Sequence, residues 1–187
     1  KPGSVGIPVP GTEVQVVDLE QGSRPLPVGE KGEIRLRGPQ LMRDYRNLPA
    51  ETAAALRDGW LYTGDIGEFD ADGYLYIRDR KKEMAKVSGF NVFPREIEEV
   101  LFMHPGVQEA AVVAAPDDYR GEVVKAFVVA RGGGETSAEQ LMAHCQANLA
   151  KYKLPVSIDL VSQLPKTAVG KIDKNRLRAD LAGGQQA

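Results

Sequence analysis

Three stretches of the sequence place polar residues where they could do chemistry. The first, GWLYTGD from Gly59 to Asp65, leads an aromatic-rich strand into a Thr-Gly-Asp turn. A carboxylate raised into a cleft by such a turn can accept hydrogen bonds from two hydroxyl donors, such as the vicinal pair of a ribose. An aspartate that only closes a turn is the simpler interpretation, and the triplet alone favours it.

The second stretch, DRKKEMAKVSGFNVFP from Asp79 to Pro94, joins a run of cations to a Ser-Gly pair. A charged, solvated linker is the usual structure of such a run. A nucleic-acid patch is the weaker alternative, because Asp79 and Glu83 dilute the positive charge and the aromatic residues Phe90 and Phe93 lie beyond it.

The third stretch, PKTAVGKIDK from Pro165 to Lys174, places Lys171 beside a glycine. A rigid Leu-Pro start followed by small or flexible residues describes a loop that could reach a neighbouring site and deliver one positive charge. Exposure to solvent is, however, the commonest state of any lysine. The spacing leaves both interpretations open.

Other familiar catalytic patterns are absent from the sequence, including the P-loop, the dinucleotide-binding glycine pattern, H-E-x-x-H and G-x-S-x-G. His144 and Cys145 are adjacent on an expected helix, where successive side chains diverge by about 100°. They are therefore not predicted to form a catalytic pair. His104, just before Pro105, is interpreted as a helix-end residue.

The composition narrows the classes of function. The formal charge of −2 on 187 residues gives no overall field that would attract nucleic acid or an acidic membrane. One cysteine excludes an intramolecular disulfide and a thiolate metal cluster, and it is typical of a reducing compartment, so a cytoplasmic location is expected. The apolar run 110–115 is far shorter than the roughly 20 residues that span a bilayer, so no transmembrane segment is predicted.

The N-terminal half has the pattern of antiparallel strands. Short runs of alternating β-branched and polar residues, EVQVVD, GEIRLRG and YLYIRD, are separated by Gly, Pro and Asp clusters. Asp72-Gly73 is a hairpin signal, and one short helix is expected over about 50–56. We predict a small β-rich, barrel-like subdomain over residues 1–79.

The C-terminal half alternates between helical and extended patterns. Pro94 in a first-turn position, with Ile97 and Leu101 at helical spacing, predicts an amphipathic helix. Apolar runs over 110–115 and 123–130 predict buried strands.

Further along, Thr136 and Ser137 offer alternative capping boxes for a helix that presents Cys145 on its apolar face. A short strand, VSIDLV, and a helix over 174–181 are expected after it. The fold class is therefore predicted to be α+β, with a compact domain over residues 80–187 in which helices flank a small sheet.

Together the three stretches resemble the signature sequences of the adenylate-forming superfamily, specifically those of the fatty acyl-CoA synthetases, also called fatty-acid–CoA ligases. DGWLYTGDIGEFDADGYLYIRDRKK, KVSGFNVFPREIEEVL and LPKTAVGKIDKNRLR match in the order found in that family. GPQLMRDYRNLPAET resembles its G-x-x-x-M-x-x-Y-x-N-x-P-x-x-T segment, with Asp44 where glycine is frequent. Ala85 stands where a larger aliphatic residue is usual, and the resemblance covers nearly the whole chain.

The resemblance implies a reaction in two steps. A fatty acid attacks the α-phosphate of ATP to give acyl-adenylate and pyrophosphate, and coenzyme A then displaces AMP to form the thioester. Asp65 is implied to bind the ribose hydroxyls, and Arg80 to support the same ribose or the phosphate. Lys82 is implied to be the hinge about which the C-terminal domain rotates between the steps.

For the two steps themselves, the resemblance implies that Lys171 bridges the substrate carboxylate and the nucleotide oxygens during adenylation. Rotation would then remove Lys171 and bring the strand with Lys86, Ser88 and Gly89 to the nucleotide, where glycine lets the pantetheine arm pass close to the backbone.

The resemblance also sets expectations about partners. ATP, AMP and coenzyme A are the expected nucleotide substrates, and Mg²⁺ is expected in the full-length enzyme with no ligand in this chain. Residues 1–79 would end the large N-terminal adenylation domain, and the family's phosphate loop and acyl pocket would precede Lys1. The chain starts without Met and is interpreted as a segment of a longer protein. The chain alone is thus expected to be inactive and to bind no nucleic acid. Peripheral contact with a membrane is compatible with these expectations. A non-catalytic binding module and an enzyme that loads a carrier-protein thiol are the alternatives.

Overall fold

The computed structural model describes residues 1–132 and 136–184. The chain divides into two compact units, Lys1–Lys82 and Glu83–Ala187, which are described separately below. The division falls inside the charged run after the last strand of the first unit. That run is itself structured, because the short 3₁₀ helix η1 occupies Lys81–Glu83.

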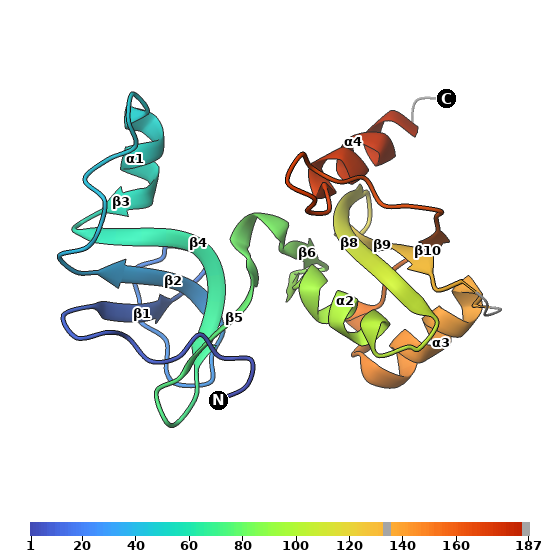
Figure 1. Ribbon diagram of the computed structural model, residues 1–187, viewed down its shortest axis with the longest axis horizontal. Helices are drawn as coiled ribbons and strands as arrows, with labels where there is room; N and C mark the ends of the chain where they lie inside the picture. Colours follow the sequence, from blue (N-terminus) through green and yellow to red (C-terminus); the bar gives the residue numbers. More distant parts are fainter. Residues whose placement is uncertain (133–135, 185–187) are drawn as a thin grey trace. The chain divides into compact units, whose positions relative to one another are not determined.

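The first unit is built on a five-stranded antiparallel sheet in the order β1-β2-β4-β3, with β5 also paired to β4. Its central strand β4 is long and visibly curved (Figure 1). The sequence periodicity explains this sheet, because the alternating residues of each strand place one apolar face against a common core. Its elements are β1 Glu13–Val17, β2 Gly32–Arg37, α1 Pro49–Ala55, β3 Leu56–Arg57, β4 Trp60–Phe69 and β5 Leu75–Arg80.

Two features of the first unit set the geometry of β4. Val16, Ile34 and Leu75 form the buried core beneath the sheet. The register between β4 and β5 shifts between Ile66 and Gly67, a bulge that bends the strand. The segment before the bulge, which includes the Thr-Gly-Asp triplet, is thereby set at an angle to the rest of the sheet.

The second unit contains a second five-stranded sheet, in the order β10-β9-β6-β7, with β8 also paired to β9. The β9–β10 pair is parallel and the other pairs are antiparallel. Its elements are β6 Ala85–Val87, β7 Phe90–Val92, α2 Pro94–Phe102, β8 Val107–Asp117, β9 Gly121–Ala130, α3 Ala138–Asn148, η2 Lys151–Lys153, β10 Ser157–Leu160 and α4 Lys174–Gly184.

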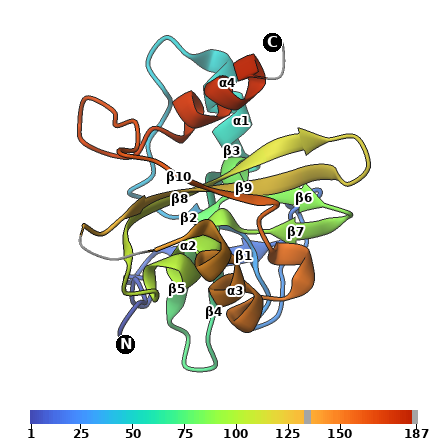
Figure 2. The same ribbon diagram turned by 90° about the vertical axis from the view of Figure 1, so that its right-hand side faces the viewer.

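Helices cover both faces of this second sheet. Successive residues of β8 point to opposite faces, so Ala110 and Val112 pack with α2 and α3, whereas Ala111 and Val113 pack with Leu177 of α4. Figure 2 shows α4 on one side of the sheet and α2 and α3 on the other. Because both faces are covered, β8 and β9 are nearly continuous apolar runs.

The observed structure confirms the predicted α+β class and refines several elements. The helix expected over 174–181 extends to Gly184, and β8 and β9 are longer than the apolar runs that predicted them. Of the alternative caps, Ser137 begins α3: its Oγ accepts from the Gln140 backbone N–H at 3.3 Å, and Gln140 Oε1 accepts from the Ser137 N–H at 2.9 Å. The charged run from Asp79 onward is not an extended linker, since it completes β5 and forms η1.

Candidate active site

Asp65 and Arg80 are direct partners on neighbouring strands. They are opposite each other in the β4–β5 register, and Arg80 Nε donates to Asp65 Oδ1 at 2.7 Å. The Asp65 side chain is 23% exposed and that of Arg80 is 59% exposed, so the pair is at the surface of the sheet and open to a ligand. The salt bridge occupies Oδ1, and a carboxylate has lone pairs to accept further donors.

The backbone before Asp65 is fixed by local hydrogen bonds. Thr63 Oγ1 donates to the Ile34 carbonyl at 2.9 Å and accepts from the Asp65 N–H at 3.0 Å. Gly64 has φ of +70°, in the left-handed region that favours glycine. The triplet is therefore a rigid kink inside a strand, in which threonine and glycine set the direction of the aspartate.

A partly buried ion pair involves the residue that follows Arg80. Lys81 Nζ is 2.7 Å from Oε2 of Glu33, whose side chain is only 5% exposed. Asp79, also buried, accepts from the Arg80 backbone N–H at 2.7 Å. These contacts fix the backbone on both sides of Arg80. Glu33 was not singled out from the sequence, because a lone glutamate within a strand pattern gives no signal.

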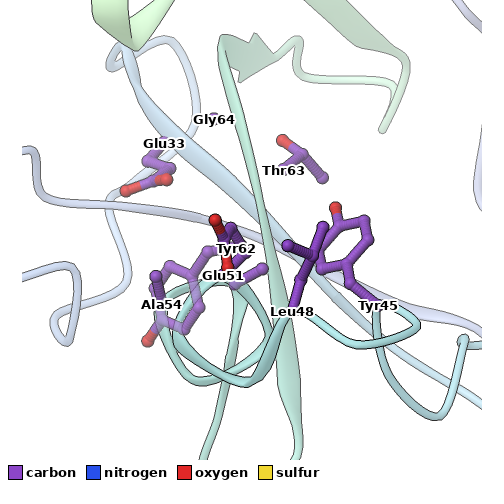
Figure 3. Close-up of a pocket in the computed structure, with 9 residues that line it drawn as sticks. Glu33, Tyr45, Leu48, Glu51, Ala54, Tyr62, Thr63 and Gly64 are labelled. Carbon is purple, nitrogen blue, oxygen red and sulfur yellow. The ribbon is translucent and has the colours of Figure 1, made fainter.

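A pocket of about 470 Å³ lies beside the Thr-Gly-Asp triplet, between α1 and β4. Figure 3 shows the aromatic ring of Tyr45 and the Leu48 side chain near Thr63, with Glu33 near Gly64. The pocket is open and mostly apolar, and it ends one residue before Asp65.

Lys171 lies in a small hairpin that precedes α4. Lys166 and Ile172 form a β-bridge at its base. Across the hairpin, the Thr167 N–H donates to the Lys171 carbonyl at 2.7 Å, and the Lys171 N–H donates to Thr167 Oγ1 at 3.2 Å. Gly170, with φ of +79°, closes the turn directly before Lys171. The Lys171 side chain is exposed, and no partner for its ammonium group is found among residues 1–132 and 136–184.

Lys86, Ser88 and Gly89 share a second hairpin, between β6 and β7. Ser88 (φ +48°) and Gly89 (φ +85°) form its two-residue turn, the combination of positive φ angles typical of a type I′ turn. The Lys86 N–H donates to Glu122 and the Ser88 N–H to the Arg120 carbonyl, which ties the hairpin to the β8–β9 loop and the start of β9. All three residues are exposed.

The structure thus brings some of the predicted residues together and leaves others apart. Asp65 and Arg80 are in contact within the first unit, and Lys82 is exposed at its end, in η1. The turn at Ser88 and the hairpin of Lys171 are separate features of the second unit. Their assigned roles remain predictions.

Neither a metal centre nor a membrane-spanning helix is seen in the part of the chain that the structure describes. No cluster of three or more His, Cys, Asp or Glu side chains there could hold a metal ion. None of the helices there has the length and apolar character needed to cross a bilayer. Burial raises the pKa of the Cys145 thiol, which keeps it protonated and unreactive.

Comparison with known proteins identifies the family. The sequence-family model described as AMP-binding enzyme matches residues 1–46. The family model described as AMP-binding enzyme C-terminal domain matches residues 96–171. The chain belongs to the AMP-binding enzyme family. The resemblance found in the sequence motifs is thereby confirmed, and the C-terminal-domain match falls on the unit that holds Lys171.

Individual relatives agree with this assignment. A long-chain-fatty-acid–CoA ligase of Bacillus subtilis (strain 168) is 50% identical over 177 residues, which are 95% of this chain and 31% of the relative. ScoC of Streptomyces coeruleorubidus, a fatty acid–[acyl-carrier-protein] ligase, is 46% identical over 94% of this chain and 33% of its own. The crystal structure of ATP-bound MatB from Rhodopseudomonas palustris matches with a TM-score of 0.89 and 38% identity, covering 96% of this chain and 36% of MatB. The chain therefore spans about a third of the length of the relatives it matches.

Proposed function

We propose that this chain is the C-terminal part of a fatty acyl-CoA synthetase. The enzyme would join a fatty acid to ATP as acyl-adenylate with release of pyrophosphate, and then transfer the acyl group to coenzyme A with release of AMP. The single observation on which the proposal rests is the cross-strand pair of Asp65 and Arg80, exposed and in register within the stretch that resembles the family's signature. The identity to the Bacillus subtilis ligase supports the fatty acid as substrate.

The paired side chains suit a nucleotide ribose. A carboxylate accepts from hydroxyl groups, whereas a guanidinium donates to oxygens, so the pair offers both kinds of hydrogen bond at one place. Asp65 would accept from the ribose hydroxyls, and Arg80 would donate to the same ribose or to the phosphate. The rigid Thr63–Gly64 kink holds Asp65 before the nucleotide arrives.

Lys171 would act in the first step through its charge. The carboxylate oxygen of the acid attacks the α-phosphorus, the bond from that phosphorus to the bridging oxygen breaks, and pyrophosphate leaves. An ammonium group between the two anions stabilises the charge that gathers as the mixed anhydride forms. Its position on an exposed hairpin, without a partner in the described residues of this chain, leaves it free to bind a substrate.

The second step would use a different part of the same unit. The thiol of coenzyme A attacks the acyl carbonyl, the thioester bond forms, AMP leaves with the anhydride oxygen and the thiol proton is released. The turn at Ser88–Gly89 would lie against the pantetheine arm, because a residue without a Cβ lets a chain pass close to the backbone. Lys82 would be the hinge that exchanges this turn for Lys171.

The remaining parts of the reaction would lie outside this chain. The resemblance implies that Mg²⁺ accompanies ATP and takes its protein ligands from elsewhere in the full-length enzyme. We propose that the partners are the fatty acid, ATP, coenzyme A and the rest of the adenylation domain. A cytoplasmic location agrees with the single buried cysteine.

A second candidate is an enzyme that delivers the acyl group to a carrier protein. The similarity to ScoC favours it, since that relative is a fatty acid–[acyl-carrier-protein] ligase of nearly the same identity. A non-catalytic module is the third candidate, and the intact Asp65, Arg80 and Lys171 argue against it.

The test is a full-length enzyme supplied with fatty acid, ATP and Mg²⁺, in which pyrophosphate release and thioester formation are followed separately. With coenzyme A as acceptor we expect acyl-CoA, whereas thioester only on a holo carrier protein would favour the second candidate. Pyrophosphate release in neither assay would contradict both. Residues 1–187 alone are expected to release no pyrophosphate above background.

A further inference from the structure

The hairpin of Lys171 is attached to the second unit by ion pairs at both of its ends. Before the hairpin, Lys166 Nζ is 2.8 Å from Glu109 Oε1 on β8. After it, Lys174 Nζ is 2.6 Å from Glu98 Oε1 on α2. The two lysines flank Lys171 at five residues before and three residues after, so both ends of the segment are held while its tip is exposed.

Glu98 is the more rigidly placed of the two glutamates. Its side chain is 14% exposed and that of Lys174 is 20% exposed, so water screens this pair less than a surface pair. The same Oε1 accepts from the Val112 backbone N–H of β8 at 2.7 Å. Glu98 therefore connects three elements, namely α2, β8 and the first residue of α4.

Helix α4 holds this arrangement over its first two turns. Asp173 begins the helix by accepting from the Arg176 N–H at 3.1 Å, and Leu177 is buried against the sheet. Arg178 is one turn after Lys174 on the same face and pairs with Glu83. Lys171, two residues before Asp173, is thus next to an anchored helix rather than in a free loop.

We propose that Glu98 is a positioning residue for Lys171 in the adenylation step. By fixing Lys174 at the start of α4, it sets where the hairpin projects the Lys171 ammonium group. The assignment rests on the proposed function, because it requires Lys171 to act on the acid and ATP. Glu98 lies in the stretch KVSGFNVFPREIEEVL, but the resemblance implied no role for it, and here it would act through Lys174 rather than on either substrate.

The experiment uses full-length enzyme carrying Glu98→Gln, with adenylation and thioester formation measured separately. The amide oxygen of glutamine still accepts from Val112, so only the charge toward Lys174 is removed. A displacement of about 1 Å costs up to about 100-fold in rate, so we expect kcat for adenylation to fall by about 10-fold to 100-fold while KM for ATP stays within about twofold. Thioester formation from supplied acyl-adenylate should be unchanged, because it uses the turn at Ser88–Gly89.

Glu99→Gln is the matched control. Glu99 is the next residue on α2, and its ion pair, to Arg95 at 3.2 Å, stays within the same helix. The change removes the same charge at nearly the same place, and adenylation should keep its normal rate.

A second pair of variants separates positioning from folding. Lys174→Arg keeps the charge that meets Glu98 and should restore most of the adenylation that Lys174→Met loses. The proposal would be overturned if Glu98→Gln and Lys174→Met each lost adenylation and thioester formation equally. It would also be overturned if neither variant lost adenylation. If Lys171→Ala itself retained adenylation, the proposed function would fail; if only Glu98→Gln retained it, the positioning role alone would fail.

Discussion

Replacing Asp65 with asparagine separates nucleotide binding from stability. Asparagine is nearly the same size, but it has one acceptor oxygen and an NH₂ group that cannot accept from a hydroxyl. The substitution therefore removes the charge-assisted hydrogen bonding to the ribose, and it turns the NH₂ group either toward Arg80 or toward the ribose hydroxyls.

The structure sets the size of the two effects. The pair with Arg80 is more than half exposed on the arginine side, so its loss changes the free energy of unfolding by about 0–1 kcal/mol, or a melting shift of at most about 4 °C. A hydrogen bond to a charged group contributes about 1.5–3 kcal/mol. We expect KM for ATP to rise by about 10-fold to 100-fold while the fold is kept.

The assay is initial-rate pyrophosphate release against ATP concentration in the full-length enzyme, with thermal melting in parallel. Glu68→Gln is the control, because Glu68 forms a similar ion pair with Arg78, 2.6 Å apart, on the same two strands. That variant should bind ATP normally. A large melting shift in Asp65→Asn with unchanged KM would show that Asp65 is only a structural residue of the sheet.

Two further predictions concern stability. The pKa of Asp18 is held well below its ordinary value of 3.8 by hydrogen bonds from four backbone N–H groups, those of Arg24, Gln21, Gly22 and Ser23. The ionised Asp18 therefore stabilises the fold fully above pH 3.8, and this stabilisation is lost as the pH falls toward the lower pKa of the folded state. Asp18→Asn should lower the melting temperature at pH 7, and the difference from the unmodified protein should shrink in melts below pH 3.8; a constant difference would contradict this. Cys145 is fully buried in the core, so the native protein should not react with a thiol reagent, and Cys145→Ser should cost about 1–3 kcal/mol in a denaturant titration. Rapid labelling of Cys145 in the native protein would refute the expectation that its thiol is inaccessible.

Much of the fold follows from local patterns in the sequence. Alternation of apolar and polar residues predicted β1, β2 and β5, and Pro94 with its helical spacing predicted the start of α2. These signals are local because each element buries one face, and that face repeats with the period of the element.

Two features could not be predicted in this way, the first because it is too short and the second because its partners are distant in the sequence. The two-residue strand β3 exists only because it pairs with Trp60 and Leu61 of β4, and no periodicity can occur over so short a length. The run RDRKKEMAK gave the pattern of a solvated linker because its charges are dense. Arg80 and Lys81 are instead partnered by Asp65 and Glu33, which lie 15 and 48 residues earlier.

The candidate site shows the same division. Asp65 and Lys171 stood out because glycine and small residues around them permit unusual backbone, and Gly64 and Gly170 do have positive φ. Glu98 gave no signal, since one glutamate among several on a helix has the appearance of a solvated face. Its partner Lys174 is 76 residues away, and only the packing of α4 against the sheet brings the two together.

The central claim is that Lys171 supplies charge for one half-reaction only, and the most direct test is to measure both half-reactions in full-length Lys171→Ala. The side chain has no partner in the described part of this chain, so its removal should not affect folding. Lys151→Ala, at another exposed lysine, is the charge control. We predict that pyrophosphate release falls by about 10²–10³ while thioester formation from supplied acyl-adenylate is unchanged. Equal loss of both steps, or normal pyrophosphate release, would contradict the account.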